Sequence, residues 1–570
     1  MKLDDIIPLL GNFGRYQFFM VCYMGSVSIV LCLTILGNVF YAAGTGHWCS
    51  VLPEENCSGW TEFRDNCTEV KRSLFSPLEG NDSTRPYSSC KQWELPDGYV
   101  FDPDVPLDDA DNETLEEVPC EDGWEYDRSQ YRSTTVTDFN LVCDDINLPG
   151  LAQSIYFAGF LVGSLVMGTV SDWCGRKRSL LLGLLFWFVG FIVTSFSVNI
   201  YMYTAFRFLA GFGGIGAYIS TYVLLLEVVG QAWRNAVTMI AGIFFAVGYF
   251  ILATAAMFVR DWRTLSLVLS VPSVVLLFPV IFVQESIRWL VSKGRIDEAE
   301  TVLRRVAKFN MKTLPDVLFD QADAQEQMES QKSKIPPSAI DLYRSPNMLL
   351  KTLNLQFNWM VNNLVYYGLS QSTGELGVNI YWAFFVSGAV EIPALFYAVF
   401  GVEWFGRKWN TAVLELIGGI ACLATIFIPT GIWRTVVSMV GKFCISVTFS
   451  LIYLYSIEVF PTPVRAVGVG VCSIASRIGA ILSPVILLSK HAAADLPLIL
   501  FGSSAVIAGL LVFFLPETKG RKLPQTLKEG EEIGKCRCLR RGADDQSAID
   551  LYETNVNKDS AAILTDLASN

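Results

Sequence analysis

Three short motifs each occur twice in this chain, and the two copies lie almost the same distance apart in every case. The offsets between copies are 231, 231 and 232 residues. The copies pair Ser171-Asp-Trp-Cys-Gly-Arg-Lys with Val402-Glu-Trp-Phe-Gly-Arg-Lys, Glu227-Val-Val-Gly-Gln-Ala-Trp-Arg with Glu458-Val-Phe-Pro-Thr-Pro-Val-Arg, and Gln284-Glu-Ser with Pro516-Glu-Thr. Three motifs at one spacing indicate an internal duplication, so we expect the two halves of the chain to share one fold.

The stretches between these motifs are long and apolar. Only 17% of the 570 residues are charged, against about 25% in soluble proteins. A membrane-spanning helix needs roughly 20 apolar residues, and the chain offers twelve such stretches. They are 17–41, 149–170, 180–198, 201–225, 236–258, 264–284, 348–369, 379–401, 409–428, 433–457, 466–489 and 496–515. The sequence therefore predicts an all-α membrane protein of two six-helix repeats, with its substrate site between the halves.

A polar insertion follows the first apolar stretch. Between Tyr41 and Asp145 the chain has 24 acidic and 7 basic residues. Six cysteines and four Asn-X-Ser/Thr sites lie in it, a combination typical of a glycosylated, disulfide-bonded extracellular loop. Six cysteines allow 15 pairings, which the sequence leaves open. The cysteines are Cys49, Cys57, Cys67, Cys90, Cys120 and Cys143, and the glycosylation sites are Asn56, Asn66, Asn81 and Asn112.

An extracellular loop after the first of twelve spans places both termini in the cytosol. Lys and Arg are concentrated in the loop Cys174–Arg178, in 285–347 and in the tail, as expected for cytosolic segments. The first residues lack the basic start of a signal peptide, so we expect the first span to remain uncleaved. With the spans described above, the sequence predicts a multi-pass protein of the plasma membrane. The expected division is 1–16 (cytosolic), 17–41 (first span), 42–147 (glycosylated loop), 148–284 (spans two to six), 285–347 (cytosolic helices), 348–515 (spans seven to twelve) and 516–570 (cytosolic tail).

The motifs also carry a family resemblance. Gly168-Thr-Val-Ser-Asp-Trp-Cys-Gly-Arg-Lys-Arg resembles the loop motif of the major facilitator superfamily. More narrowly, the chain resembles solute carrier family 22, the organic cation, carnitine and organic anion transporters, from about Asp4 to Lys522. The likeness rests on the cysteine-rich loop and on Cys120-Glu-Asp-Gly-Trp-Glu-Tyr, Thr137-Asp-Phe-Asn-Leu-Val-Cys-Asp, Glu285-Ser-Ile-Arg-Trp-Leu and Glu391-Ile-Pro-Ala. Departures from the pattern are Val399 and Glu403 in the second loop motif, and Gln284 where the family has proline.

The resemblance implies that the charged cytosolic motifs form a gate. Such a network clamps the two halves together in the outward-facing state and breaks as the protein rocks inward, so it is expected to govern turnover rather than substrate choice. The residues are Asp172, Arg176, Lys177, Arg178, Glu227, Arg234, Glu285, Arg288, Glu403, Arg407, Glu458 and Arg465.

Arg477 lies near the middle of the stretch 466–489. A charge in the hydrocarbon core costs about 2.5–3.5 kcal/mol, so it needs a reason. In the resembling family, cation carriers have an acid here, whereas anion and carnitine carriers have arginine. A guanidinium binds a carboxylate through two parallel hydrogen bonds. Arg477 is therefore a candidate site for a substrate carboxylate, and the alternative is a structural pair with a buried acid.

Glu391 lies in the middle of the stretch 379–401. It is expected to face a substrate ammonium, or to pair with Arg477 when the site is empty. The anion carriers of the resembling family combine an acid and a lysine in this motif, whereas Leu395 stands here, which favours cations and zwitterions. The alternative is a helix contact beside Pro393. Lys442 either lines the cavity or is structural.

Aromatic residues supply a third component of the expected site. Electron-rich rings hold quaternary ammonium groups through cation–π attraction, worth about 0.5–2 kcal/mol each. Aromatic side chains are equally common at lipid-facing and interfacial positions, so each ring has that alternative. The candidates are Tyr218, Tyr222, Trp359, Tyr366, Tyr367 and Tyr453.

These features predict alternating-access transport of organic zwitterions and cations similar to carnitine or carcinine. The alternatives are an organic anion exchanger, and a membrane receptor that binds ligand through 42–147. With two histidines, His47 and His491, and no Walker motif, the chain predicts no enzyme, metal site or cofactor; a coupling sodium ion or proton is left open. The expected partners are the organic ion and the lipid bilayer, with no nucleic acid, and the loop is a possible contact for a homo-oligomer.

Overall fold

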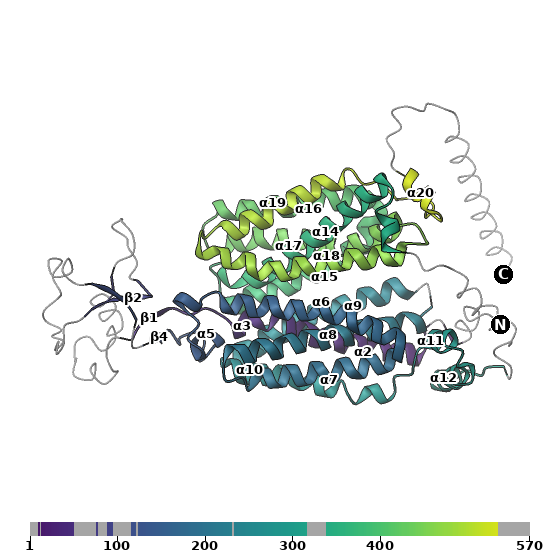
Figure 1. Ribbon diagram of the computed structural model, residues 1–570, viewed down its shortest axis with the longest axis horizontal. Coiled ribbons are helices and arrows are strands. Elements are labelled where there is room, and N and C mark those ends of the chain that lie inside the picture. The colour runs from purple at the N-terminus through teal and green to yellow at the C-terminus, as the bar shows by residue number, and fades with distance from the viewer. Residues whose placement is uncertain are drawn as a thin grey trace, which may run out of the picture.

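The computed structural model describes residues 10–11, 13–50, 76–77, 88–94, 116–120, 123–230, 233–315 and 338–533. Its long helices form two groups of six, drawn one above the other in Figure 1. The first group, here called the N-half, consists of α2 (Arg15–Leu36), continued by α3 (Asn38–Tyr41), α6 (Leu148–Cys174), α7 (Arg176–Ser195), α8 (Ile200–Val228), α9 (Arg234–Phe258) and α10 (Trp262–Val275). The second, the C-half, consists of α14 (Pro346–Gln371), α15 (Ile380–Phe405), α16 (Arg407–Ala424), α17 (Ile432–Val459), α18 (Arg465–Leu488) and α19 (Leu496–Val512).

Ten helices of the described chain are long and apolar enough to cross a membrane. The other two members of the halves are α14 and α19. α19 has 17 residues and is therefore short. α14 has 26 residues but carries Lys351 and five asparagines, at 347, 354, 358, 362 and 363. Polar groups of this kind are costly in lipid, so α14 is expected to face the protein interior.

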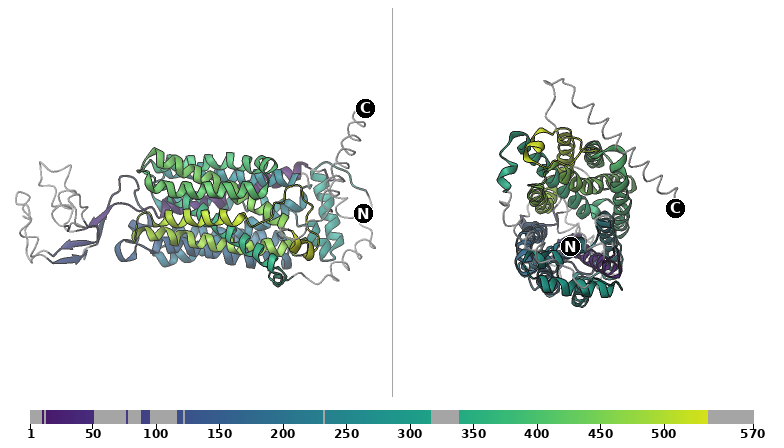
Figure 2. Two further views of the ribbon diagram at one scale, coloured as in Figure 1. Left: turned by 90° about the horizontal axis from the view of Figure 1, so that it is seen from above. Right: turned by 90° about the vertical axis from the view of Figure 1, so that its right-hand side faces the viewer.

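The two ends of the bundle differ in what extends from them. One end, here called the loop end, carries the polar insertion (left in Figure 1). The other, the tail end, carries the short helices α11 (Ile287–Ser292), α12 (Ile296–Phe309) and α20 (Leu527–Glu532). The end-on view in Figure 2 shows the N-half and the C-half as two separate clusters of helices. Short 3-10 turns complete the chain at Cys143–Asp145, Pro279–Ile281, Ala339–Leu342, Ser372–Glu375, Thr425–Phe427 and Ser489–His491.

The described part of the insertion is a pair of two-stranded antiparallel ribbons. β1 (His47–Cys49) pairs with β4 (Trp124–Tyr126), in the register His47 opposite Tyr126. β2 (Lys91–Trp93) pairs with β3 (Glu117–Pro119), and the short helix α5 (Thr135–Asp138) leads back to the bundle. Disulfides join Cys49 to Cys120 and Cys90 to Cys143. The other two loop cysteines and all four predicted glycosylation sites lie outside the described residues.

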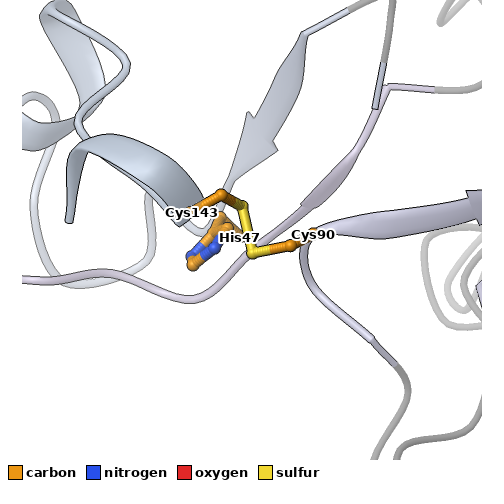
Figure 3. A group of neighbouring side chains, drawn as sticks. All are labelled: His47, Cys90 and Cys143. Atoms are coloured by element: carbon orange, nitrogen blue, oxygen red, sulfur yellow. A yellow bond between two sulfur atoms is a disulfide. The ribbon is translucent and has the colours of Figure 1, made fainter. Parts of the chain in front are cut away.

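His47 lies beside the Cys90–Cys143 disulfide, as Figure 3 shows. One ring nitrogen and the two sulfurs come within 4.8 Å of one another, close enough for a metal group. Metals bind the thiolate form of cysteine, and both sulfurs are taken up by the disulfide. While the Cys90–Cys143 disulfide is intact, the three residues therefore pack against one another and do not form a metal site.

The duplicated motifs form the same turn in both halves. The chain reverses from α6 to α7 at Gly175 (φ 106°) and from α15 to α16 at Gly406 (φ 80°). Glycine adopts positive φ without the steric cost that a Cβ brings. A Cβ at Gly175 would also lie 2.4 Å from the Glu285 carboxylate, and one at Gly406 would lie 2.8 Å from that of Glu517. The glycine in each motif therefore lets a carboxylate approach the first turn of the next helix.

Candidate substrate-binding site

A buried ion pair joins α15 and α17 near the middle of the C-half. Lys442 Nζ lies 3.4 Å from Glu391 Oε1, and the two side chains are 1% and 10% exposed. A buried charge needs both a counter-charge and further hydrogen bonds to offset its desolvation. Lys442 has them, because it also donates to Ser387 Oγ and, at 3.1 Å, to Tyr249 OH. Glu391 therefore pairs with Lys442 and not with Arg477, the partner considered from the sequence.

Tyr249 connects this pair to the other half of the molecule. It belongs to α9 of the N-half, and its ring lies under the ammonium, with Nζ 4.4 Å from the ring centre. Its hydroxyl lies 3.4 Å from Tyr366 OH and 3.2 Å from Ser370 Oγ, both on α14. A Cβ at Gly388 of α15 would lie only 2.4 Å from Tyr249 Cβ, so α9 and α15 cross closely here. The Lys442 cluster thus holds the two halves together.

Further contacts between the halves lie closer to the loop end. Ser154 Oγ of α6 donates to the Ile481 carbonyl of α18 at 2.9 Å. The ring of Phe40 packs against Phe384 of α15, with 5.2 Å between ring centres. The loop end of the bundle is therefore closed in this conformation.

Arg477 lies one helix away, on α18, and has no acidic partner among the described residues. Its guanidinium donates to Ser473, at the backbone carbonyl (2.9 Å) and at the hydroxyl. Its Nε is buried and has no hydrogen-bond partner. It is within electrostatic range of the Tyr367 and Tyr453 hydroxyl groups. The structural pair with a buried acid, the alternative from the sequence, is not formed here.

The position of Arg477 is set by close packing of its helix. A Cβ at Gly479 would lie 2.0 Å from the Met360 carbonyl oxygen of α14. Only glycine permits this approach, which brings α18 against α14. Asn363 of α14 then donates to the backbone carbonyl and the hydroxyl of Ser476, the residue before Arg477.

Four of the predicted aromatic residues form a group beside Arg477, in which Tyr367 and Tyr453 are the two that interact with the guanidinium. Tyr218 and Tyr222 of α8 stack on each other with 6.3 Å between ring centres. Tyr218 is within electrostatic range of Tyr367 and Tyr453 in the C-half. Tyr453 is 40% exposed. The rings therefore come from both halves, as the walls of a substrate site between them would.

The other two predicted rings have different surroundings. Trp359 is 0% exposed; its Nε1 donates to Ser456 Oγ at 2.8 Å and its ring lies 4.1 Å from that of Tyr453. Trp359 therefore packs against the ring of Tyr453 inside the C-half and is not itself exposed to a substrate. Tyr366 is buried beside Lys442, with Nζ 5.6 Å from its ring centre, so it belongs to the Lys442 cluster.

The charged motif residues at the tail end bond within each half. In the N-half, Arg176 pairs with Asp172 at 3.0 Å and with Glu227 at 3.9 Å. In the C-half, Arg407 pairs with Glu458 at 2.8 Å. These ion pairs tie helices of one half together, and none of them crosses to the other half.

Carboxylates cap the same helix in each half. Glu285 Oε1 accepts from the backbone N–H groups of Arg176 (2.8 Å) and Lys177 (3.1 Å) at the start of α7. Glu517 accepts from those of Arg407 (2.9 Å) and Lys408 (3.1 Å) at the start of α16. Burial opposes ionisation of Glu517, but these and two further backbone N–H groups hold the pKa of its carboxyl below its usual range.

The remaining predicted gate residues are less constrained. Arg465 donates to the Phe460 carbonyl at 3.2 Å and to Thr462 at 3.1 Å. Arg178 and Glu403 are exposed, and Arg234 and Arg288 are partly buried.

Three residues of these sites were not predicted from the sequence: Glu517, Tyr249 and Ser387. Glu517 carried a signal, because it is the repeat equivalent of Glu285. Tyr249 and Ser387 carried none, since a tyrosine and a serine in apolar helices are ordinary residues until a lysine is brought beside them.

A hollow of about 740 Å³ lies at the loop end, lined by residues of both halves such as Asn38, Arg260 and Tyr381. None of the nine predicted substrate residues lines it. It is separated from them by the contacts that close the loop end, and it is therefore not the candidate site.

Comparison with known proteins identifies the family. Residues 123–528 match the model of the sugar (and other) transporter family. Solute carrier family 22 member 13 of Homo sapiens is 33% identical over 530 residues, covering 92% of this chain and 93% of the relative. The human organic cation/carnitine transporter 2 is 34% identical over 532 residues, with the same coverage of both chains.

The fold agrees with this assignment. The xylose transporter XylE from E. coli, in a partially occluded inward open conformation, matches with a TM-score of 0.56 and 14% identity, covering 89% of this chain and 100% of that one. The predicted major facilitator fold is thus confirmed, and the relatives are transporters rather than enzymes. The chain belongs to solute carrier family 22 of the major facilitator superfamily.

Proposed function

We propose that this transporter of organic cations accepts zwitterions, molecules that carry a carboxylate and an ammonium group together. The observation that carries the proposal is the placement of Arg477, a partly buried guanidinium without an acidic partner among the described residues. It lies beside Tyr367 and Tyr453, which in turn lie near Tyr218 of the N-half. The guanidinium suits a carboxylate, and the rings of Tyr218, Tyr222 and Tyr453 suit an ammonium group. A similar relative is named an organic cation/carnitine transporter, and carnitine is such a zwitterion.

Glu391 has a different part in this proposal from the one expected. Its carboxylate is already neutralised by Lys442, so it is not available to a substrate ammonium while the loop end is closed. The pair instead acts as a latch between the halves, through Tyr249. Opening of the loop end would release Tyr249 from Lys442, while the Glu391–Lys442 pair stays within the C-half and faces an entering substrate.

We infer that the loop end faces the cell exterior and that both termini are cytosolic, in the plasma membrane. The two disulfides of the loop support this orientation, because disulfides persist in oxidising compartments. In that orientation the structure is an inward-facing conformation. Surface biotinylation of cells, combined with enzymatic removal of N-linked sugars, tests the orientation; a loop that carries no sugar at the cell surface would contradict it.

Uptake by cells tests the substrate class directly. Carnitine, tetraethylammonium and benzoate represent a zwitterion, a cation and an anion, and Arg477→Ala is compared with the wild-type chain at equal surface expression. We expect carnitine uptake, and its loss in Arg477→Ala. The control is Arg304→Ala, which removes a partly exposed arginine of α12 paired with Glu300 and should leave uptake unchanged. Uptake of tetraethylammonium alone, unaffected by Arg477→Ala, would overturn the proposal.

An organic anion exchanger is a second candidate, because the Glu391–Lys442 pair leaves Arg477 as the unpaired charge of the site. Benzoate uptake that exceeds carnitine uptake, and that Arg477→Ala removes, would favour it. The family relationship leaves no reason to retain the receptor alternative.

A further inference from the structure

The C-half buries an acid that takes no part in the substrate site. Glu415 of α16 is 0% exposed. Its Oε1 accepts a hydrogen bond from Asn362 Nδ2 of α14 at 2.8 Å, whereas Oε2 is buried without a hydrogen-bond partner. Asn362 in turn accepts from Thr448 Oγ1 of α17 at 2.6 Å. Three helices thus meet at one carboxyl group.

No cation among the described residues is placed to neutralise Glu415. α19, which packs along α16, has no titratable side chain, and α14 presents amide groups. The other charged residues of α14, α16 and α17 lie toward the ends of these helices, apart from Lys442, whose charge is engaged with Glu391 of α15. Those nearer the ends are Lys351, Arg407, Lys408, Arg434 and Glu458, and none of them forms an ion pair with Glu415. An ionised carboxylate buried without a counter-ion costs several kcal/mol. Glu415 is therefore neutral in this conformation and carries a proton.

The neighbours of Glu415 are polar atoms that also lack partners. Thr411 lies one turn before it on α16, and Asn358 lies one turn before Asn362 on α14. Thr411 Oγ1 and Asn358 Oδ1 are both buried without hydrogen bonds. An acid proton is a donor and the Asn358 oxygen is an acceptor, so this region has complementary groups on facing turns of two helices.

A polar path leads from Glu415 toward the tail end along α14. Asn358 Nδ2 donates to Asn354 Oδ1 at 2.8 Å. Asn354, one turn further, lines a hollow of about 400 Å³ together with Asn347 and Lys351 of α14; the other six lining residues are leucines and phenylalanines of α14 and of the segment 511–515. The asparagines of α14 therefore form a ladder that connects the buried acid to the surface of the bundle.

The same helix connects Glu415 to the contacts between the halves. Tyr366, one turn after Asn362, approaches Tyr249 of the N-half. Asn363 binds Ser476, the neighbour of Arg477. A movement of α14 at Asn362 would therefore alter two sets of contacts. One is the contact of Tyr366 with Tyr249, which helps to close the loop end, and the other is the contact of Asn363 with Ser476, beside Arg477.

We propose that Glu415 is a proton-binding site, occupied when the loop end is closed, whose proton is released and rebound once in each transport cycle. The inference rests on the proposed function, because it assigns the coupling ion of that transport. The step is a dissociation in which Glu415 COOH becomes a carboxylate and its proton passes to a water molecule that enters beside the polar groups of α14. A carboxylate repels the Asn358 oxygen and attracts the Asn362 amide, so proton release favours a different position of α14.

Infrared spectroscopy of the purified full-length protein tests the proton itself, without any substrate. A protonated carboxyl has a carbonyl band that an ionised one lacks. We expect this band at neutral pH in the wild-type protein and its loss in Glu415→Gln. Glu298→Gln, at an exposed position of α12, is the matched control and should keep the band. A band that persists unchanged in Glu415→Gln would overturn the proposal.

Proteoliposomes test the coupling, with carnitine as the probe and a pH-sensitive dye inside. We expect a pH gradient to drive carnitine accumulation by the wild-type protein, and Glu415→Gln to lose this accumulation while it still exchanges carnitine across the membrane. Glu415→Asp retains a carboxyl group and should restore part of the gradient-driven accumulation, which separates loss of the proton from loss of the fold. Wild-type carnitine uptake without proton movement would overturn the coupling. Absence of carnitine exchange in all variants, with the infrared result intact, would instead contradict the proposed function.

Discussion

The two ends of the bundle are held together in different ways. At the tail end, arginines and acids of the duplicated motifs bind within their own half, as in Arg176–Asp172 and Arg407–Glu458. From the middle of the bundle toward the loop end, the contacts run from one half to the other and use hydroxyl groups, aromatic rings and one lysine, Lys442. The comparison teaches that the conspicuous charges keep each half rigid, whereas less conspicuous residues decide which end of the bundle is closed.

Loss of the lysine at the loop end should have the largest effect. Lys442→Ala leaves Glu391 buried without its counter-charge, and breaking one side of a buried pair costs about 3–5 kcal/mol. We expect a strong fall in thermal stability in detergent. The double variant Lys442→Met with Glu391→Leu removes both charges and should recover most of that loss. Equal destabilisation by the single and double variants would show that the pair has no energetic role.

At the tail end, the two capping carboxylates provide a matched pair of variants. Glu285→Gln and Glu517→Gln each replace an ionised acceptor of backbone N–H groups at the start of a helix. Hydrogen bonds to charged groups contribute about 1.5–3 kcal/mol, so we expect similar losses of stability in the two variants, measured by thermal unfolding. A loss confined to one variant would mean that the two halves are less equivalent than the repeat predicts.

The hydroxyl of Tyr249 should set the balance between closed and open loop ends. Tyr249→Phe removes the hydrogen bonds to Tyr366, Ser370 and Lys442 while it keeps the ring. One hydrogen bond is worth about 1 kcal/mol net, or about fivefold in an equilibrium, so the loss of three should shift the balance by about fivefold or more. With cysteines introduced at positions 154 and 481, whose residues touch across the halves, we expect at least this decrease in disulfide formation in Tyr249→Phe. Unchanged cross-linking would place the control of closure elsewhere.

The smallest effect is a pH dependence of the tail end. The pKa of Glu517 is held below its usual value of 4.5 by the backbone N–H groups, so its contribution to stability is complete above that value. The contribution is lost as the pH falls through the folded-state pKa. Thermal unfolding in detergent from neutral to acid pH should therefore show a decline in the wild-type protein, and Glu517→Gln should lack the corresponding part of it.

Much of the architecture could be predicted from the sequence. Repeated motifs and apolar stretches require two similar helical halves, because a spanning helix must satisfy its own backbone hydrogen bonds. The two-half helical architecture was predicted on this basis, and the major facilitator fold and the family were predicted from the resemblance of the motifs; both are confirmed. The α14 helix shows the limit of the hydropathy argument, since its asparagines place it below an apolar threshold although it belongs to the bundle.

The site could be predicted only in its components. Arg477, Glu391, Lys442 and the tyrosines were identified as intramembrane polar or aromatic residues, which are rare enough to be informative. Their partners were not predictable. The pairing of Glu391 with Lys442, and the isolation of Arg477, depend on how α15, α17 and α18 are rotated about their axes. The functional roles of these residues stay predictions.

By itself the sequence determined the helices, the duplication and the residue types available for an ion, because these follow from composition and spacing along the chain; it indicated the family through the resemblance of its motifs. Tertiary structure alone decided which charges neutralise each other, which end of the bundle is closed, and that Glu415 has no counter-ion in the described part of the chain. The physical reason is distance. Ion pairs and hydrogen bonds act over a few ångströms, and residues as far apart as Tyr249 and Lys442 reach that separation only after the two halves have packed together.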